Sequence, residues 1–192
     1  MREPVRVLDL GTRGYRDVLE LQRGLARGRR SGTLDHDVLL LVEHPCVITL
    51  GRGSERAHLL ATDTQLRARG VEVVEVERGG DVTCHGPGQI VGYPILDLHG
   101  YRKDLHWYLR RLEEVCLRTL RAYSLAGTRV ASYTGVWTTG AEVHDPEAVG
   151  AEGAHSEASF PTVAEAEAAT LIPRGTVRKI ASIGVHASRW VT

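Results

Sequence analysis

The chain has 192 residues, of which 42% are hydrophobic, and it carries 24 basic and 24 acidic side chains. A chain of this length fits one domain with a sizeable core, and its neutral balance gives no global signal for a nucleic-acid or membrane partner. No apolar run approaches the ~20 residues of a membrane-spanning helix, and the N-terminus lacks the apolar core of a signal peptide. Cys46, Cys84 and Cys116 show no CxxC or paired spacing. The sequence therefore predicts a cytoplasmic protein with reduced thiols.

Apolar patterns predict several strands and one long helix in the first half of the chain. A single apolar face on residues 15–29 predicts a helix, and residues 57–69 are expected to be helical or irregular. The continuous apolar run of residues 37–43 is typical of a strand buried on both faces, and residues 46–50 are expected to form its partner strand. The strands expected in this half cover residues 5–10, 37–43, 46–50, 71–77 and 90–97.

The second half begins with the clearest helical pattern of the sequence. A helix is expected over residues 104–123, with Asp104 as its N-cap. Glu113 is expected on the charged face, opposite the apolar stripe. The residues of that stripe are Leu105, Tyr108, Leu109, Leu112, Val115, Cys116, Leu120 and Tyr123.

Two further strands are expected around residues 128–139 and 178–188. The segment between them, residues 140–176, is rich in Ala, Glu and Gly and has no sustained amphipathic period. Its central part, residues 141–173, holds seven acidic side chains and no Lys or Arg, which leaves a formal charge of +7 on the rest of the chain. We expect a flexible insertion here, with a short helix at most over residues 164–170.

Residues 78–89 form the most informative segment. Four glycines, a proline, an arginine and a histidine fall within these twelve residues, between two expected strands. Glycine is tolerated where the backbone adopts positive φ or lies close to another group. The segment therefore indicates the floor of a groove, with Arg78 and His85 directed into it. A glycine-rich hairpin turn is the alternative interpretation.

The order of residues in this segment resembles that of a known family. Arg-Gly-Gly-x-Val-Thr-x-His-Gly-Pro-Gly-Gln, followed by Val-Gly-Tyr-Pro-Ile, is similar to the signature of lipoyl(octanoyl) transferases. Other segments agree with the family in order and content: Leu40–Pro45, Gly135–Trp137 and Arg178–Val185. The resemblance implies the α/β (α+β) fold of biotin and lipoate protein ligase catalytic domains. This fold is a mixed sheet with flanking helices, here in a single domain over residues 1–192.

The resemblance also implies an acyl-transfer reaction. Enzymes of this family move an octanoyl or lipoyl group from acyl carrier protein to a lysine of lipoyl domains, both in 2-oxoacid dehydrogenases and in the glycine cleavage H protein. No cofactor or metal is implied, because a thioester is already activated, and the nine histidines show no metal-ligand spacing. Lys179 corresponds to the family's catalytic lysine, whose ammonium favours a neighbouring thiolate and can shuttle protons.

The other residues implied at the site bind the acyl substrate. Gly79 and Gly80 would let the acyl chain lie against the backbone, and Thr83 and His85 could hydrogen-bond the thioester or fix the loop. Cys84 stands where the family usually has an aromatic residue, so it is either a substitute nucleophile or a small residue filling that place. The full implied set is Arg78, Gly79, Gly80, Asp81, Val82, Thr83, Cys84, His85, Ser182, Ile183 and Gly184.

One departure from the family concerns the nucleophile. In the resembled enzymes it is the cysteine of a Pro-Cys-Gly segment that follows a His-Gly-x-Ala segment, and this sequence stops at Thr192 before either. The expectation is a catalytic domain that is incomplete at its C-terminus. Two alternatives stay open beside the transferase. One is a catalytically inactive remnant that only binds acyl carrier protein or lipoyl domains, and the other is an ATP-dependent lipoate or biotin ligase.

Overall fold

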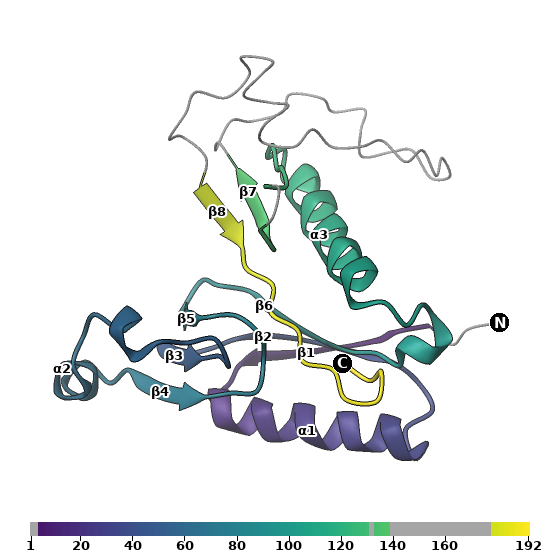
Figure 1. The fold of residues 1–192 in the computed structure, drawn as a ribbon, viewed down its shortest axis with the longest axis horizontal. Helices are drawn as coiled ribbons and strands as arrows, with labels where there is room; N and C mark the ends of the chain where they lie inside the picture. The colour runs from purple at the N-terminus through teal and green to yellow at the C-terminus, as the bar shows by residue number, and fades with distance from the viewer. Residues whose placement is uncertain (1–3, 131–132, 139–177) are drawn as a thin grey trace. The chain divides into compact units, whose positions relative to one another are not determined.

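The computed structural model describes residues 4–130, 133–138 and 178–192 (Figure 1). The insertion expected at residues 140–176, with its short helix, lies outside the described residues. Within the described part of the chain, no helix combines the length and the apolar character that crossing a bilayer requires.

The chain divides into two compact units. Met1–Lys103 and Gly184–Thr192 make up the first unit, and Asp104–Ile183 makes up the second. In chain order, the second unit is therefore inserted between two parts of the first.

Three strands form the first sheet of the first unit, in the order β1, β2, β6. β1 runs parallel to β2 and β6 runs antiparallel to it, which confirms the prediction of a mixed sheet. On β2 the side chains alternate between buried and half-buried, so the expectation of a strand buried on both faces is wrong for the second face. The three strands span Arg6–Thr12 (β1), Val38–Glu43 (β2) and Val91–Ile95 (β6).

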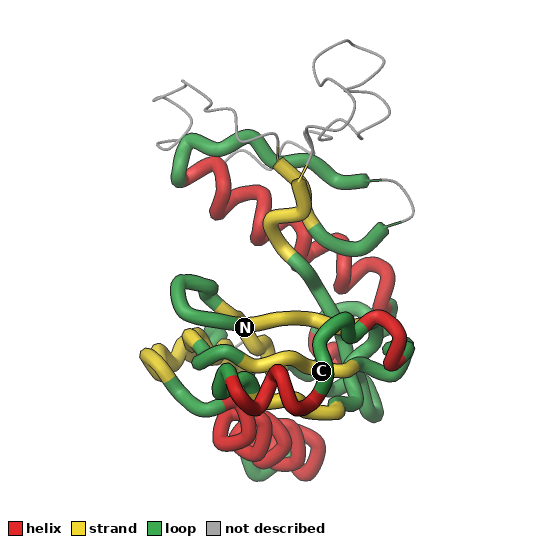
Figure 2. Tube along the Cα trace, turned by 90° about the vertical axis from the view of Figure 1, so that its left-hand side faces the viewer, coloured by secondary structure: helices red, strands yellow, loops and turns green. Residues whose placement is uncertain are grey.

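Helix α1 (Tyr15–Ser31) packs against one face of this sheet (Figures 1 and 2). The apolar face that predicted the helix places Val18 in the core. The helix ends at Gly32, whose φ of 77° lies in the left-handed region that glycine adopts without strain. The buried core between helix and sheet consists of Val18, Val38, Leu40, Val42, Ile95 and Val191.

A second sheet of the first unit has the order β4, β3, β5. β3 runs parallel to β4 and antiparallel to β5. The glycine-rich segment thus contains a strand of its own, β5, which the sequence did not predict. The strands on either side of it, β4 and β6, belong to different sheets, so the hairpin interpretation is wrong. The strands of this sheet are Val47–Leu50 (β3), Glu72–Glu75 (β4) and Val82–His85 (β5).

The expected pairing of residues 46–50 with residues 37–43 is also wrong, because β3 lies in the second sheet. The reason is the link between the two strands. The His44 side chain is completely buried, and its Nδ1 and Nε2 atoms lie 2.8 Å from the Arg13 carbonyl oxygen and 2.9 Å from the Tyr93 hydroxyl. These contacts anchor the link inside the unit, and the chain leaves the first sheet instead of folding back along it.

Two short helices follow β3, where helical or irregular structure was expected: η1 (Arg56–His58) and α2 (Asp63–Ala68). A capping box starts α2, because the Thr62 hydroxyl accepts from the Gln65 N–H and the Gln65 side chain accepts from the Thr62 N–H. This short connection leads the chain from β3 to β4 at the edge of the second sheet.

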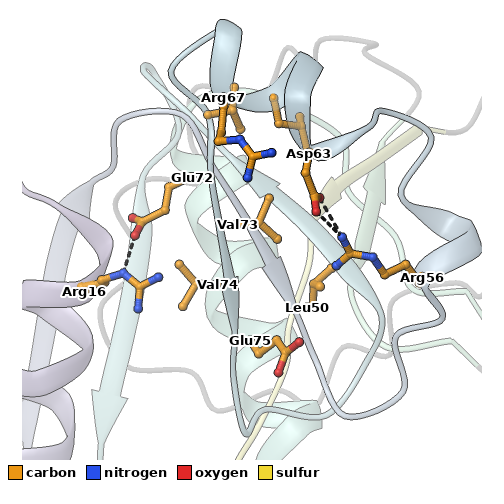
Figure 3. A pocket seen from close by; sticks show the side chains of 11 residues that line it. Arg16, Leu50, Arg56, Asp63, Arg67, Glu72, Val73, Val74 and Glu75 are labelled. Carbon is orange, nitrogen blue, oxygen red and sulfur yellow. Dashed lines mark hydrogen bonds and ion pairs between the residues drawn. The ribbon is translucent and has the colours of Figure 1, made fainter.

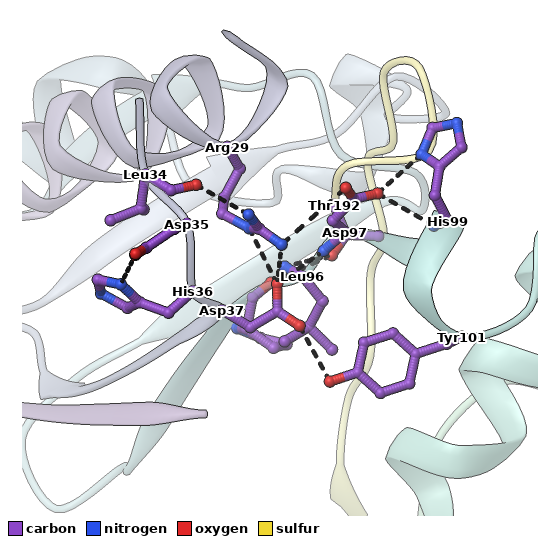
Figure 4. Close-up of polar contacts among 11 residues, drawn as sticks. Arg29, Leu34, Asp35, His36, Asp37, Leu96, Asp97, His99, Tyr101 and Thr192 are labelled. Carbon is purple, nitrogen blue, oxygen red and sulfur yellow. Dashed lines mark hydrogen bonds and ion pairs between the residues drawn. The ribbon is translucent and has the colours of Figure 1, made fainter. Parts of the chain in front are cut away.

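Asp37, just before β2, is the centre of a buried polar cluster (Figure 4). Its carboxylate accepts hydrogen bonds from Arg29 Nε (3.0 Å), the Asp97 N–H (3.0 Å) and the Tyr101 hydroxyl (2.9 Å). Arg29 also donates to the Leu34 carbonyl oxygen at 2.8 Å. The cluster ties the end of α1 to the start of β2 and to the chain that follows β6.

The last residues of the chain return to the first unit. The Leu98 N–H donates to the Trp190 carbonyl oxygen (2.8 Å), and Asp97 forms a β-bridge with Val191. Leu98 begins the short helix η2 (Leu98–Gly100). The strand expected over residues 178–188 is only partly confirmed. Its first part is β8 (Arg178–Ala181), and residues 182–188 form no regular β-strand.

The second unit contains helix α3 (Leu105–Ala122) and a two-stranded antiparallel sheet of β7 (Val136–Thr138) and β8 (Arg178–Ala181). The predicted helix cap is confirmed, since the Asp104 side chain accepts a hydrogen bond from the Trp107 N–H at 3.0 Å. Trp137 of β7 lies directly opposite Lys179 of β8.

The predicted faces of α3 are partly wrong. Tyr108 and Leu117 are buried, but Val115 and Tyr123 of the predicted apolar stripe are 59% and 72% exposed. Glu113, expected on the charged face, is only 1% exposed. Two arginines and a backbone N–H compensate its buried charge, and a hydrophobic pattern cannot reveal such partners.

Candidate active site

Arg78 follows β4 and has a half-buried side chain that points back to the second sheet. Its Nη2 atom donates to the carbonyl oxygen of Thr49 (3.0 Å) and to the Thr49 hydroxyl (2.7 Å), and Nη1 donates to the Gly79 carbonyl oxygen (3.1 Å). Burial lowers the pKa of the guanidinium. Because these hydrogen bonds connect Arg78 to Thr49 of β3, they fix the start of the glycine-rich segment against the second sheet.

The loop after β3 holds the two glycines that follow Arg78. The Arg52 N–H donates to the Arg78 carbonyl oxygen (3.0 Å), and the Gly53 N–H donates to the Gly80 carbonyl oxygen (3.1 Å). A Cβ atom on Gly51 would lie 2.4 Å from that Gly80 oxygen, so only glycine fits there. The backbone at 78–80 therefore lies pressed against the 51–53 loop.

The structure brings Gly184 next to the start of the glycine-rich segment, as the resemblance implies. The Gly79 N–H donates to the Val185 carbonyl oxygen at 3.2 Å. A Cβ atom on Gly184 would lie 3.0 Å from the Gly79 carbonyl oxygen and 3.1 Å from Arg78 Cδ. Both segments belong to the first unit, and their backbones are in contact there.

His85 ends β5 inside a cluster of aromatic rings. Its ring stacks on Tyr15 at 6.1 Å between centroids and meets His44 edge to face at 6.0 Å. Nδ1 lies 2.6 Å from Gln89 Oε1, so Nδ1 carries the hydrogen of this bond. Burial, the largest cause, lowers the pKa of His85 and favours a neutral ring. Tyr93, which bonds His44, has a pKa raised mainly by burial.

Sequence reasoning missed Tyr15, His44 and Tyr93 as members of this cluster. His44 and Tyr93 lie in segments that carry the resemblance, but neither was given a role. Tyr15 was predicted only as part of a helix face. These residues are far apart in sequence, so their spacing does not predict a contact. They meet because the start of α1, the end of β2 and the middle of β6 lie together in the fold.

The remaining residues of the segment lie on β5 or beside it. Asp81 is exposed, and its carboxylate lies 2.6 Å from His58 Nδ1; a backbone hydrogen bond from Val82 is the main cause of its lowered pKa. The Thr83 carbonyl oxygen accepts from the Thr49 hydroxyl at 3.4 Å. Cys84 is exposed and unpaired with another cysteine.

Lys179, Ser182 and Ile183 belong to the second unit, whereas the other predicted site residues belong to the first. Within the second unit, Lys179 Nζ lies 5.1 Å from the ring centroid of Trp137, the geometry of a cation–π contact. Ser182 is exposed and Ile183 half-buried, and both follow the end of β8. That Lys179 faces residues 78–85 stays a prediction.

A hollow of about 600 Å³ on the first unit lies apart from these residues (Figure 3). β4 and α2 form its walls, and ion pairs between Arg16 and Glu72 and between Arg56 and Asp63 cross its rim. None of the predicted site residues lines it. It is therefore not part of the candidate active site.

Comparison with known proteins gives a consistent result. The octanoyltransferase of Acidobacterium capsulatum is 43% identical over 98% of this chain and 66% of its own length. The octanoyltransferase of Thermosynechococcus vestitus is 50% identical over 70% of this chain and 58% of its own length. The octanoyltransferase of Gloeobacter violaceus is 39% identical over 97% of this chain and 65% of its own length. The chain thus spans 58–66% of the length of these three relatives.

The fold has a counterpart among solved structures. A structure from the archaeal lipoylation system of Thermoplasma acidophilum, described as a bipartite lipoate protein ligase and its E2 lipoyl domain, superposes with a TM-score of 0.52 and 19% identity, over 72% of this chain and 52% of the other. This likeness concerns the fold alone. Residues 14–192 match the model of one family, the lipoyl protein ligase A/B catalytic domain. The chain belongs to the lipoyl protein ligase A/B catalytic domain family.

Proposed function

We propose that this chain takes part in octanoyl transfer, moving an octanoyl or lipoyl group from acyl carrier protein to a lysine of a lipoyl domain. The observation that carries the proposal is the 43% identity with an octanoyltransferase over 98% of the chain. Two contacts of the predicted site support it: Gly79 bonds Val185 in the first unit, and Lys179 lies over Trp137 in the second.

The proposed reaction exchanges one acyl bond for another. The C–S bond of the octanoyl thioester breaks, an amide C–N bond to the acceptor lysine forms, and the carrier thiol leaves with one proton. Thioester and amine supply all atoms and electrons, so no ATP or cofactor takes part. In this reaction the Lys179 ammonium would stabilise the leaving thiolate by its charge and give it a proton. The neutral Lys179 amine would then accept the proton that the attacking amine loses.

Residues 78–85 and 182–184 would form the wall of the octanoyl site. Gly79, Gly80 and Gly184 have no side chains between the acyl chain and the backbone. Arg78 and Thr49 would hold that wall in place through their buried hydrogen bonds. We place the reaction in the cytoplasm, where the free cysteines Cys46, Cys84 and Cys116 would remain thiols.

A transfer assay tests this function. The purified chain is mixed with octanoyl-acyl carrier protein and a lipoyl domain that lacks its acyl group, and the octanoyl amide on the domain is measured by mass spectrometry. We expect transfer by the wild-type chain and its loss in Lys179→Met. Lys103→Met, which changes the other lysine of the sequence, is the matched control and should transfer as wild type does.

The same mixture tests whether a thiol of this chain carries the acyl group during the transfer. Peptide mapping shows whether octanoate is attached to Cys46, Cys84 or Cys116, and a Cys84→Ser variant tests the exposed cysteine of β5 directly. If neither an octanoyl adduct nor transfer is observed, the proposal for this chain is overturned. Formation of an adenylate from ATP and free octanoate would point to a ligase instead.

A further inference from the structure

Glu113 is a buried carboxylate at the centre of the second unit. Its Oε2 atom accepts from Arg110 Nη1 at 2.7 Å and from Arg129 Nε at 3.1 Å. Its Oε1 atom accepts from the backbone N–H of Gly135 at 3.2 Å. Removing a carboxylate from water is costly unless its partners are well placed, so this arrangement fixes the backbone at Gly135 firmly relative to α3.

Gly135 leaves space for the Lys179 side chain because it has no side chain of its own. Its φ of 132° lies in the region that L-residues rarely adopt. A Cβ atom at this position would lie 2.6 Å from Lys179 Cε, 3.3 Å from Lys179 Nζ and 2.6 Å from the Ala181 carbonyl oxygen. The space that the missing side chain leaves is thus filled by the end of the Lys179 side chain.

Trp137 supplies the opposite boundary. It pairs with Lys179 across the β7–β8 ladder, and the pairing shifts by one residue between Val136 and Trp137. Such irregularities re-aim side chains at functional sites. The Lys179 ammonium lies over the indole face, and Tyr133 packs edge to face on the same indole at 6.3 Å between centroids.

We propose that Glu113, Gly135 and Trp137 form a seat that fixes the position of the Lys179 ammonium. They are positioning residues: Glu113 holds Gly135, Gly135 leaves room for the lysine stem, and Trp137 attracts its charge. The inference rests on the proposed function, because it explains how an exposed lysine with a flexible four-carbon stem could act as a proton shuttle with defined geometry.

The composition of the chain makes this seat directly measurable, because Lys103 and Lys179 are the only lysines in the 192 residues. In protein labelled with ¹³C,¹⁵N-lysine, the Cε protons of Lys179 should resonate upfield of those of Lys103, because the ammonium next to them lies over an indole ring. A Lys103→Arg variant assigns the two signals. Wild-type signals that coincide would overturn the proposal.

Trp137 variants separate the seat from general stability. Trp137→Leu should move the Lys179 signal to the position of Lys103, whereas Trp137→Phe, which keeps an aromatic face, should retain most of the upfield displacement. The Lys103 signal should stay unchanged in both, and far-UV circular dichroism of each variant is the control for folding. An unmoved Lys179 signal in Trp137→Leu would contradict the seat.

Glu113 variants test the link through Gly135. Glu113→Gln keeps the oxygen that accepts from the Gly135 N–H and should keep the Lys179 signal displaced, while Glu113→Ala should lose the displacement. Should Glu113→Ala not fold, the Trp137 pair decides the proposal alone.

Kinetics then connect the seat to the reaction. Trp137→Leu should lower kcat for octanoyl transfer by about 100-fold, the effect of a misplaced catalytic group, with KM for the carrier protein unchanged. A wild-type chain that shows the displaced signal but no transfer would overturn the proposed function and leave the seat intact. A normal kcat in Trp137→Leu would overturn its role in the reaction.

Discussion

Arg78 donates a hydrogen bond of 2.7 Å to the hydroxyl of Thr49, and this hydroxyl is completely buried. The same hydroxyl donates to the Thr83 carbonyl oxygen at 3.4 Å. Thr49 therefore connects the beginning of the glycine-rich segment with β5, and one oxygen atom keeps both parts in register.

Thr49→Val should destabilise the protein by about 1–3 kcal/mol, because valine has the same shape but leaves the Arg78 guanidinium and the Thr83 carbonyl without this partner. Urea unfolding followed by circular dichroism measures the difference. Thr64→Val, an exposed change of the same kind on α2, is the control and should stay within about 0.5 kcal/mol of wild type. Equal stabilities of the two variants would contradict the role of the Thr49 hydroxyl.

Gly51→Ala should lose about 1–3 kcal/mol of stability, the usual cost of forcing atoms into a packed region. Its Cβ atom would meet the Gly80 oxygen at 2.4 Å and Arg78 Nη1 at 2.8 Å. Gly53→Ala is a close control, because its Cβ atom would meet the same oxygen at 3.4 Å. Thermal unfolding of both variants compares them, and a more stable Gly51→Ala than Gly53→Ala would refute the close approach.

Asp37→Ala should cost about 3–5 kcal/mol, because it leaves the Arg29 guanidinium largely buried without its carboxylate. The Asp97 N–H and the Tyr101 hydroxyl lose an acceptor at the same time. Asp35→Ala removes a neighbouring carboxylate that is 86% exposed and should leave stability near the wild-type value. Guanidinium unfolding midpoints compare the two, and similar midpoints would argue against the cluster as an anchor.

His85 should make stability depend on pH below about pH 7. Burial lowers its pKa below the ordinary value of about 6.5, so in this range the unfolded chain binds a proton that the folded protein does not. The resulting stability is complete above about pH 6.5 and is lost as the pH falls toward the folded-state pKa. Unfolding free energies at about pH 7.5 and about pH 5.5 should differ less in His85→Gln than in wild type.

A second variant tests the effect of the Gln89 hydrogen bond on the pKa of His85. The hydrogen bond to Gln89 raises the pKa of His85, against the effect of burial. Gln89→Ala should therefore lower the pKa of His85 further, which an NMR titration of the ring proton would record. Glu77, Asp97 and Glu114 also have lowered pKa values, but carboxylates lose their contribution at more acidic pH. A pKa that rises in Gln89→Ala would contradict this account.

Local patterns predicted most of the elements but not how they pair. The apolar face of residues 15–29 and the cap at Asp104 predicted α1 and α3, because helices depend on neighbours along the chain. The sheet partners of β3 were wrong, because strand pairing depends on contacts far apart in sequence. β5 escaped prediction, since a short strand among glycines has too few side chains to show alternation.

The candidate site shows the same division. The resemblance implied both the 78–85 segment and Gly184, and the structure places Gly184 beside Arg78 and Gly79. No pattern indicated that Glu113 is buried, because a glutamate between arginines on a helix reads as a solvated residue. Its burial is explained only by the structure, in which Arg129 and the Gly135 N–H donate to its carboxylate.

The position of Val191 in the core has a consequence for folding on the ribosome. Val191 is 3% exposed and packs with Val18, Val38 and Ile95, yet about half of the chain separates it from its nearest partner in sequence. The first unit cannot complete its core until this residue has been synthesised. Contacts of such high sequence separation slow folding, so we expect the first unit to stay partly folded until the last residues of the chain have been synthesised.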